Sequence, residues 1–148
     1  MHGEPTVNTL SPELLERDLQ AKCVAWWHQS GLLGLLFHVP NEGKRNRIEA
    51  ASLAALGSVA GVSDFVLLLP GGRVHLIELK RPGGTQSEEQ RRFEAAASAM
   101  GHTYDLINSL EDFKAAVIGA CRWSLDSLRW WQQTDGSVLE IHQPSPLP

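Results

Sequence analysis

The chain has 148 residues, of which 43% are hydrophobic and 20% charged, a composition typical of one soluble globular domain. Its net charge of −4 gives no overall attraction to nucleic acid, so any such binding needs a local basic patch or a bound metal. No apolar stretch approaches the roughly 18 residues of a membrane span. Two cysteines without C-x-x-C spacing exclude a disulfide scaffold and predict a reduced, cytoplasmic protein without structural zinc.

Periodicity, caps and turn residues predict eight elements in the first 123 residues. A Ser11 cap followed by Pro12 begins the first helix, and Ser87 with Gln90 forms a capping box for a later one. In chain order we expect a helix over 11–31, a strand over 33–39, a helix over 49–56, hairpin strands over 64–69 and 73–80, a helix over 87–101, a strand over 102–108 and a helix over 109–123. This order predicts a three-layer α/β fold with a mixed central sheet flanked by helices.

The end of the chain differs in character from the rest. Residues 125–133 predict another helical turn or two, residues 135–142 predict a further strand, and a proline-rich end follows. We therefore divide the chain into a core over 11–122 and a C-terminal extension over 123–148, which we expect to pack on the core.

Two apolar runs joined by Pro-Gly-Gly form the stretch SDFVLLLPGGRVHLIELKRPGG, residues 63–84. A three-residue loop with Leu69 opposite Arg73 predicts a hairpin in which Asp64 lies across from Glu78. Carboxylates that face each other destabilise a sheet, so a cation is expected between them. Mg²⁺ or Mn²⁺ fits, because hard cations are held by one or two carboxylates together with water and other oxygens. The carbonyl of Leu79 is a further expected ligand.

Lys80 completes the charged set at this end of the hairpin. Side chains two residues apart on a strand share a face, so Lys80 lies on the face of Glu78. There its ammonium can orient a water and stabilise the hydroxide that attacks phosphorus. The alternative is an ordinary Lys–Glu pair that solvates a strand end, with Asp64 as a turn former. The D-x13-E-x-K pattern across a hairpin is moderately specific for the metal site.

The same residues carry a resemblance to a known family. A helix with Glu and Gln, a basic loop, GVSDFVLLLPGGRVHLIELKRPGG, a helical Q-x-x-F and GHTYDLINSLEDF together resemble the virus-type replication-repair nuclease (VRR-NUC) domain of the PD-(D/E)xK phosphodiesterases. The resemblance spans roughly residues 13–118, and Ser63 stands where the superfamily name has proline. It implies a restriction-endonuclease-like core and a metal-dependent endonuclease, with stand-alone members resembling homodimers that act on branched DNA such as four-way junctions.

Two helical residues complete the expected site. Glu16 matches the family's helical glutamate and borders the apolar stripe of its helix, so its carboxylate needs a partner such as a water on the metal or Lys80. The alternative is a first-turn glutamate that complements the helix dipole. Gln90 matches the family's glutamine and is expected to fix Lys80 or a phosphate, although its capping box needs no catalytic role.

Contacts to a phosphate backbone, mostly through positive charge, are expected from a basic loop and from residues after the hairpin. These candidates are Lys44, Arg45, Arg47, Arg81, Gln86, Arg91 and Arg92. Each is also explained as part of an ordinary solvated surface. His38 falls near the expected site, but a histidine at a strand end is more often structural than catalytic.

These residues lead us to expect a Mg²⁺- or Mn²⁺-dependent endonuclease that hydrolyses DNA, selects branched structures and acts as a homodimer. Glu16, Asp64, Glu78, Lys80 and Gln90 are the expected catalytic residues. One alternative is a nucleic-acid-binding module whose nuclease-like core no longer catalyses. Another is a restriction-type or RNA-directed phosphodiesterase, because a phosphate at a metal site looks alike in all of these enzymes.

Overall fold

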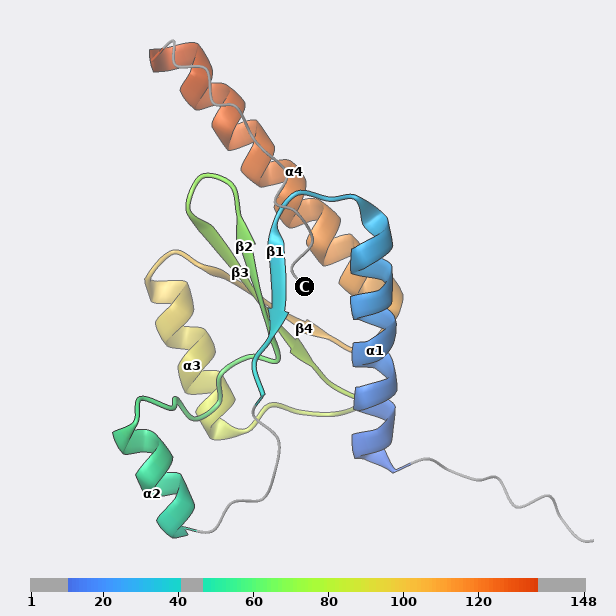
Figure 1. Cartoon of the computed structure of the whole chain (residues 1–148), viewed down its shortest axis with the longest axis vertical. Helices are drawn as coiled ribbons and strands as arrows, with labels where there is room; N and C mark the ends of the chain where they lie inside the picture. The colour runs from blue at the N-terminus through green and yellow to red at the C-terminus, as the bar shows by residue number, and fades with distance from the viewer. Residues whose placement is uncertain (1–10, 41–46, 136–148) are drawn as a thin grey trace, which may run out of the picture.

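A computed structural model describes residues 11–40 and 47–135, without the side chains of Arg47 and of residues 127–135. It contains a four-stranded sheet with helices on both faces (Figure 1). The elements are α1 (Pro12–Ser30), β1 (Leu35–His38), α2 (Arg47–Ala55), β2 (Phe65–Leu69), β3 (Arg73–Leu79), α3 (Glu88–Ala99), β4 (Thr103–Ile107) and α4 (Leu110–Asp135). The predicted α/β class and element order are confirmed. None of these described helices combines the length and the apolar character needed to cross a membrane.

The sheet is mixed, as predicted, and its strands follow the order β1-β2-β3-β4. β1 pairs with β2 and β2 with β3 in antiparallel fashion, whereas β3 and β4 are parallel and are connected through α3. The hairpin register is the predicted one, with Leu69 opposite Arg73 and Phe65 opposite Ile77. If this register is continued by one residue beyond the last pair, Asp64 lies across from Glu78.

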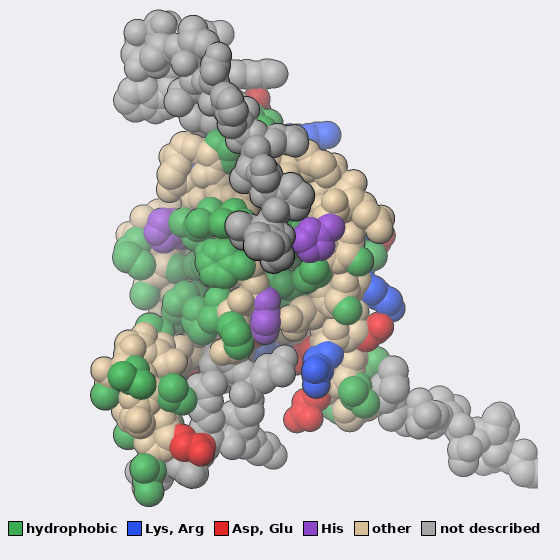
Figure 2. All heavy atoms as spheres, viewed as in Figure 1, with side chains coloured by type: hydrophobic (Ala, Val, Ile, Leu, Met, Phe, Trp, Pro, Cys, Tyr) green, Lys and Arg blue, Asp and Glu red, His purple; other side chains and the backbone are tan. Residues whose placement is uncertain are grey.

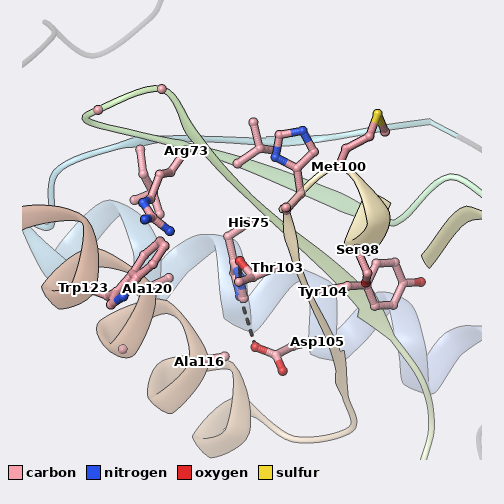
Figure 3. A pocket seen from close by; sticks show the side chains of 17 residues that line it. Arg73, His75, Ser98, Met100, Thr103, Tyr104, Asp105, Ala116, Ala120 and Trp123 are labelled. Carbon is pink, nitrogen blue, oxygen red and sulfur yellow. Dashed lines mark hydrogen bonds and ion pairs between the residues drawn. The ribbon is translucent and has the colours of Figure 1, made fainter. Parts of the chain in front are cut away.

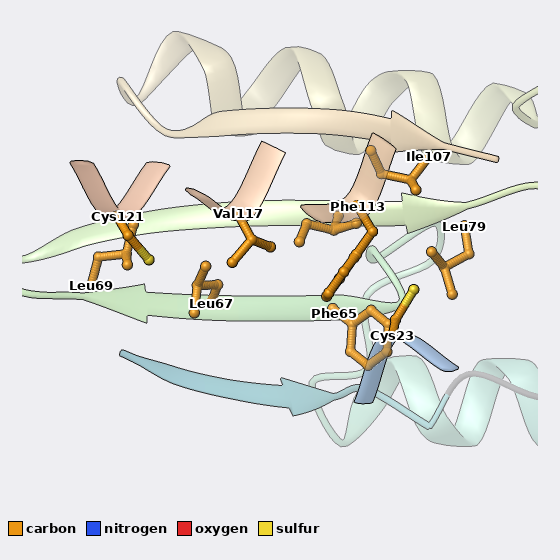
Figure 4. Close-up of a cluster of buried hydrophobic side chains, with 10 residues drawn as sticks. Cys23, Phe65, Leu67, Leu69, Leu79, Ile107, Phe113, Val117 and Cys121 are labelled. Atoms are coloured by element: carbon orange, nitrogen blue, oxygen red, sulfur yellow. The ribbon is translucent and has the colours of Figure 1, made fainter. Parts of the chain in front are cut away.

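Alternation along β2 and β3 sends one set of side chains into the core. Phe65, Leu67 and Ile77 are fully buried, and they pack with side chains of α1 and α4 on the same face of the sheet (Figure 4). Phe113 of α4 lies 5.9 Å from the ring of Phe65, and burial of each such ring contributes roughly 1.5–3 kcal/mol. α3 covers part of the opposite face. The neighbouring residues on β2 and β3 therefore face away from the α1 and α4 layer.

α4 joins two predicted segments into one helix, the helix over 109–123 and the helical turns over 125–133. It passes residue 123 without a break and its last turns project beyond the sheet (Figure 1). Ser124 explains the continuation, because this residue is buried and its Oγ donates to the carbonyl of Pro70 at 2.5 Å, tying the helix to the hairpin turn. The strand predicted over 135–142 lies outside the described residues except for Asp135, and the division at residue 122 stays a prediction.

Gly61 packs against the first turn of α3. Its φ of 75° is left-handed, and a Cβ there would overlap the backbone of Glu89 and Gln90. Gly57 has a similar φ of 91° but open space around it. Gly61 therefore fixes the approach of α3 to the chain that precedes β2.

We expect Gly61→Ala to destabilise the protein more than Gly57→Ala. Both substitutions place a side chain in a left-handed backbone, at a cost of about 1 kcal/mol or more, and only Gly61→Ala adds the overlap with α3. Urea unfolding should show at least about 2 kcal/mol of additional loss for Gly61→Ala. Equal losses for the two variants would show that α3 does not depend on this contact.

Candidate active site

Five predicted residues converge where β2 begins and β3 ends, between the N-terminal parts of α1 and α3. Asp64 directly precedes β2, Glu78 lies in β3 and Lys80 follows it, while Glu16 comes from α1 and Gln90 from α3. A hydrogen bond, an ion pair and mutual effects on pKa connect all five side chains. The tertiary structure thus brings together side chains from four parts of the chain.

Glu78 is the most buried charged residue of this group, with 1% exposure. Its Oε1 accepts from Lys80 Nζ at 2.8 Å and from Gln90 Nε2, whereas its Oε2 is buried without a hydrogen-bond partner. Burial, followed by the negative charge of Asp64, raises the pKa of Glu78 to about 7 even though Lys80 acts in the opposite direction. A cation beside Oε2 would compensate for the buried charge.

Asp64 is held through its side chain, and a hydrogen bond between its two neighbours supports the turn in which it lies. Oδ2 accepts from the Leu79 N–H at 2.7 Å, and burial raises the pKa of the carboxyl despite this hydrogen bond. The buried Ser63 donates from Oγ to the Phe65 carbonyl at 3.0 Å. A hydrogen bond therefore braces the turn where the superfamily name has a proline ring.

Gln90 has two roles in this geometry. Its Oε1 accepts from the Ser87 N–H at 2.8 Å, and its own N–H donates to Ser87 Oγ at 3.2 Å, so the predicted capping box is present. Its Nε2 donates to Glu78. The helix cap therefore fixes the amide that holds the buried carboxylate.

Glu16 joins α1 to the end of β3. Its Oε1 accepts from the main-chain N–H of Arg81 at 3.1 Å, so its hydrogen-bond partner is this backbone group while Lys80 pairs with Glu78. The charge of Glu16 also acts on the pKa of both Asp64 and Glu78. Glu16 is half-buried at the border of the site, as its position beside the apolar stripe predicted.

The donor set fits a hard divalent cation. Two carboxylates converge, and one of their buried oxygens lacks a partner. Within residues 11–40 and 47–135, no group of three or more histidine, cysteine, aspartate or glutamate side chains is arranged to hold a metal. Water and main-chain oxygens would have to complete the shell. The Leu79 carbonyl stays a prediction, since the contact the structure gives is from the Leu79 N–H.

The predicted DNA contacts fall into three groups. Arg81 is exposed beside the site. On α3, Arg91 Nη1 donates to the Gln86 carbonyl at 2.7 Å, and Arg92 pairs with Glu88. Gln86 itself donates from Nε2 to Glu94 at 2.7 Å. The candidates Lys44 and Arg45, and the side chain of Arg47, lie outside the described part of the chain.

A pocket of about 740 Å³ at the other end of β3 was not predicted from the sequence (Figure 3). There the buried His75 has Nδ1 2.6 Å from the Thr103 hydroxyl and Nε2 3.2 Å from the Asp105 carboxylate, and burial lowers the pKa of this histidine. A histidine within an apolar strand was the only signal for it. The pocket shares no residue with the carboxylate pair, so we place the active site at the strand ends.

A mixed sheet with Asp64 before one strand and Glu78-x-Lys80 at the end of the next defines a nuclease-type α/β domain of the PD-(D/E)xK class. The family model described as "VRR-NUC domain" matches residues 15–104, and the chain belongs to this family. Membership implies a nuclease-type function on DNA.

The chain is similar to solved structures, one of which, with a TM-score above 0.5, supports the fold. A "VRR_NUC domain protein" is 19% identical with a TM-score of 0.58, over 72% of this chain and 87% of that chain. A "VRR_NUC domain" is 17% identical with a TM-score of 0.49, over 70% of this chain and 94% of that chain. No curated protein matches the sequence.

We expect Glu78→Gln to stabilise the metal-free protein at high pH. The unfolded chain releases this proton near pH 4.5, whereas the raised pKa keeps the folded protein protonated until about pH 7. Stability of the unmodified protein therefore falls as pH rises through this window, and the variant is spared this fall. Between pH 4.5 and pH 8, the free energy of unfolding of the variant should rise by up to about 3 kcal/mol relative to that of the unmodified protein. Thermal unfolding in the presence of a chelator measures this difference. An equal difference between the two proteins at both pH values would contradict the buried charge.

Proposed function

We propose that this protein is a Mg²⁺- or Mn²⁺-dependent endonuclease that hydrolyses DNA phosphodiester bonds. The observation that carries the proposal is the buried Glu78 carboxylate, which has one oxygen held by Lys80 and Gln90 and the other without a partner. A structural Lys–Glu pair does not need a second carboxylate beside it, yet the half-buried Asp64 lies there. The arrangement suits charge compensation by a cation.

In this mechanism Asp64 and Glu78 would hold the cation, and Glu16 would hold a water beside it. The ion would supply Lewis-acid polarisation of the phosphate and a lowered pKa for a water. Lys80 lies 2.8 Å from Glu78 Oε1, where its ammonium orients the attacking water and stabilises the developing hydroxide. Gln90 keeps Glu78 in place through its amide. Arg81, exposed beside the site, contacts the phosphate backbone.

Lys80→Ala should abolish most cleavage while leaving DNA binding largely intact. The loss of an ammonium that acts on the developing charge is expected to lower kcat at least about a hundredfold. Lys22→Ala is a matched control, because Lys22 pairs with Asp18 on an exposed turn of α1. Cleavage of a labelled duplex in Mg²⁺ and anisotropy of the same DNA separate the two effects. Unchanged cleavage by Lys80→Ala would contradict this mechanism.

We also propose that the substrate is branched DNA and that the active form is a homodimer. The family likeness supports the branched substrate. Cleavage of a four-way junction needs two active sites at a fixed distance, which a homodimer would supply. A catalytically inactive binding module is the competing function. The presence of both carboxylates, the lysine and the glutamine in one cluster favours the enzyme.

A substrate panel tests this choice. With Mn²⁺ we expect four-way and flapped DNA to be cut faster than linear and single-stranded DNA, and the mass in solution to be twice the 16.3 kDa of the chain. Binding to every substrate without cleavage in Mg²⁺ or Mn²⁺ would support the inactive module. Equal cleavage of all four substrates by a monomer would refute the branched-DNA proposal.

A further inference from the structure

We infer that His38 is a positioning residue for Asp64, an inference that rests on the proposed function. His38 Nδ1 lies 2.9 Å from the main-chain carbonyl oxygen of Asp64. A carbonyl oxygen only accepts hydrogen bonds, so Nδ1 must carry the proton and the tautomer at this nitrogen is determined. His38 thereby acts on the carboxylate through the backbone of the same residue.

Asp64 needs this support because the strand ladder stops before it. β2 begins at Phe65, whose partner on β1 is His38 itself, and Asp64 is the next residue outward. The Val39 N–H donates to the same Asp64 carbonyl at 2.9 Å. Two donors from the end of β1 therefore continue the pairing for one residue beyond the sheet. One of them is a side chain that can be changed without altering the main chain.

The second contact of His38 is apolar and separable from the first. Its ring packs edge-on against Phe65, with centroids 6.0 Å apart and planes at 71°. Phenylalanine can keep this packing but has no donor, whereas asparagine carries an N–H at nearly the same position as Nδ1 but has no ring. Positioning and packing thus predict opposite orders for the two substitutions.

The expected effect follows from how a ligand is held. Removal of a group that hydrogen-bonds to a metal-binding residue lowers metal affinity about tenfold to a hundredfold. At Asp64 the side chain is also tied to the Leu79 N–H, so release of the main chain shifts the carboxylate relative to Glu78. The loss should therefore appear in metal uptake and in kcat, with the KM for DNA unchanged.

The experiment compares His38→Phe and His38→Asn in the full chain. Calorimetric titration of the metal-free proteins with Mn²⁺ should show at least about a tenfold weaker Kd for His38→Phe and a Kd within about threefold of the unmodified protein for His38→Asn. Thermal unfolding without metal verifies that each variant folds. His28→Phe, on the exposed last turn of α1, is the matched control and should bind Mn²⁺ normally.

Three results would overturn the inference, and they can be told apart. Normal Mn²⁺ uptake by His38→Phe would show that the ring acts only through packing on Phe65, while the proposed nuclease would stand. No Mn²⁺ uptake by the unmodified protein would remove the metal site together with the positioning role. A weaker Kd for His38→Asn than for His38→Phe would likewise assign His38 to packing.

Discussion

The buried carboxylate of Glu78 is the constraint around which the site is built. A charge with 1% exposure is costly unless neighbouring groups stabilise it. Lys80, just beyond the end of the same strand, and Gln90 of α3 both donate to this carboxylate, whereas Asp64 adds a second negative charge that raises the pKa of Glu78 further. A fold optimised only for stability would not place Asp64 there. The arrangement has the character of a functional site maintained at some cost in stability.

The sheet makes this arrangement possible because one face packs in the core while the other carries a site residue. One face of β2 and β3 is packed against α1 and α4 and anchors the strands rigidly through side chains such as Phe65 and Ile77. The alternate residues, which include Glu78, point away from that layer. Secondary-structure ends then supply the remaining groups. Gln90 belongs to a helix cap and Glu16 to the first turns of α1, so their positions are set by backbone hydrogen bonds.

Because the chain is acidic, binding of anionic DNA in the proposed function depends on positive charge close to the site. With a net charge of −4, the protein cannot rely on a general electrostatic attraction to DNA. Arg91 and Arg92 of α3 are engaged by groups of their own helix or the preceding loop, which leaves them less available for phosphate. In the proposed function, a cation between the carboxylates and Arg81 beside the site therefore supply positive charge for the phosphate backbone.

The sequence alone determined the order of elements, the hairpin register and the meeting of Asp64 with Glu78, because turn residues, caps and two-residue periodicity act over short distances. The family resemblance singled out Gln90 as a site residue, while its capping pattern predicted only the start of a helix. The tertiary structure decided the contacts between distant segments, which no local pattern encodes. Thus Glu16 meets the Arg81 N–H, Ser124 extends α4 by bonding to Pro70, and His38 supports Asp64. Each joins residues far apart in the chain, so only the packing of the elements places donor and acceptor together.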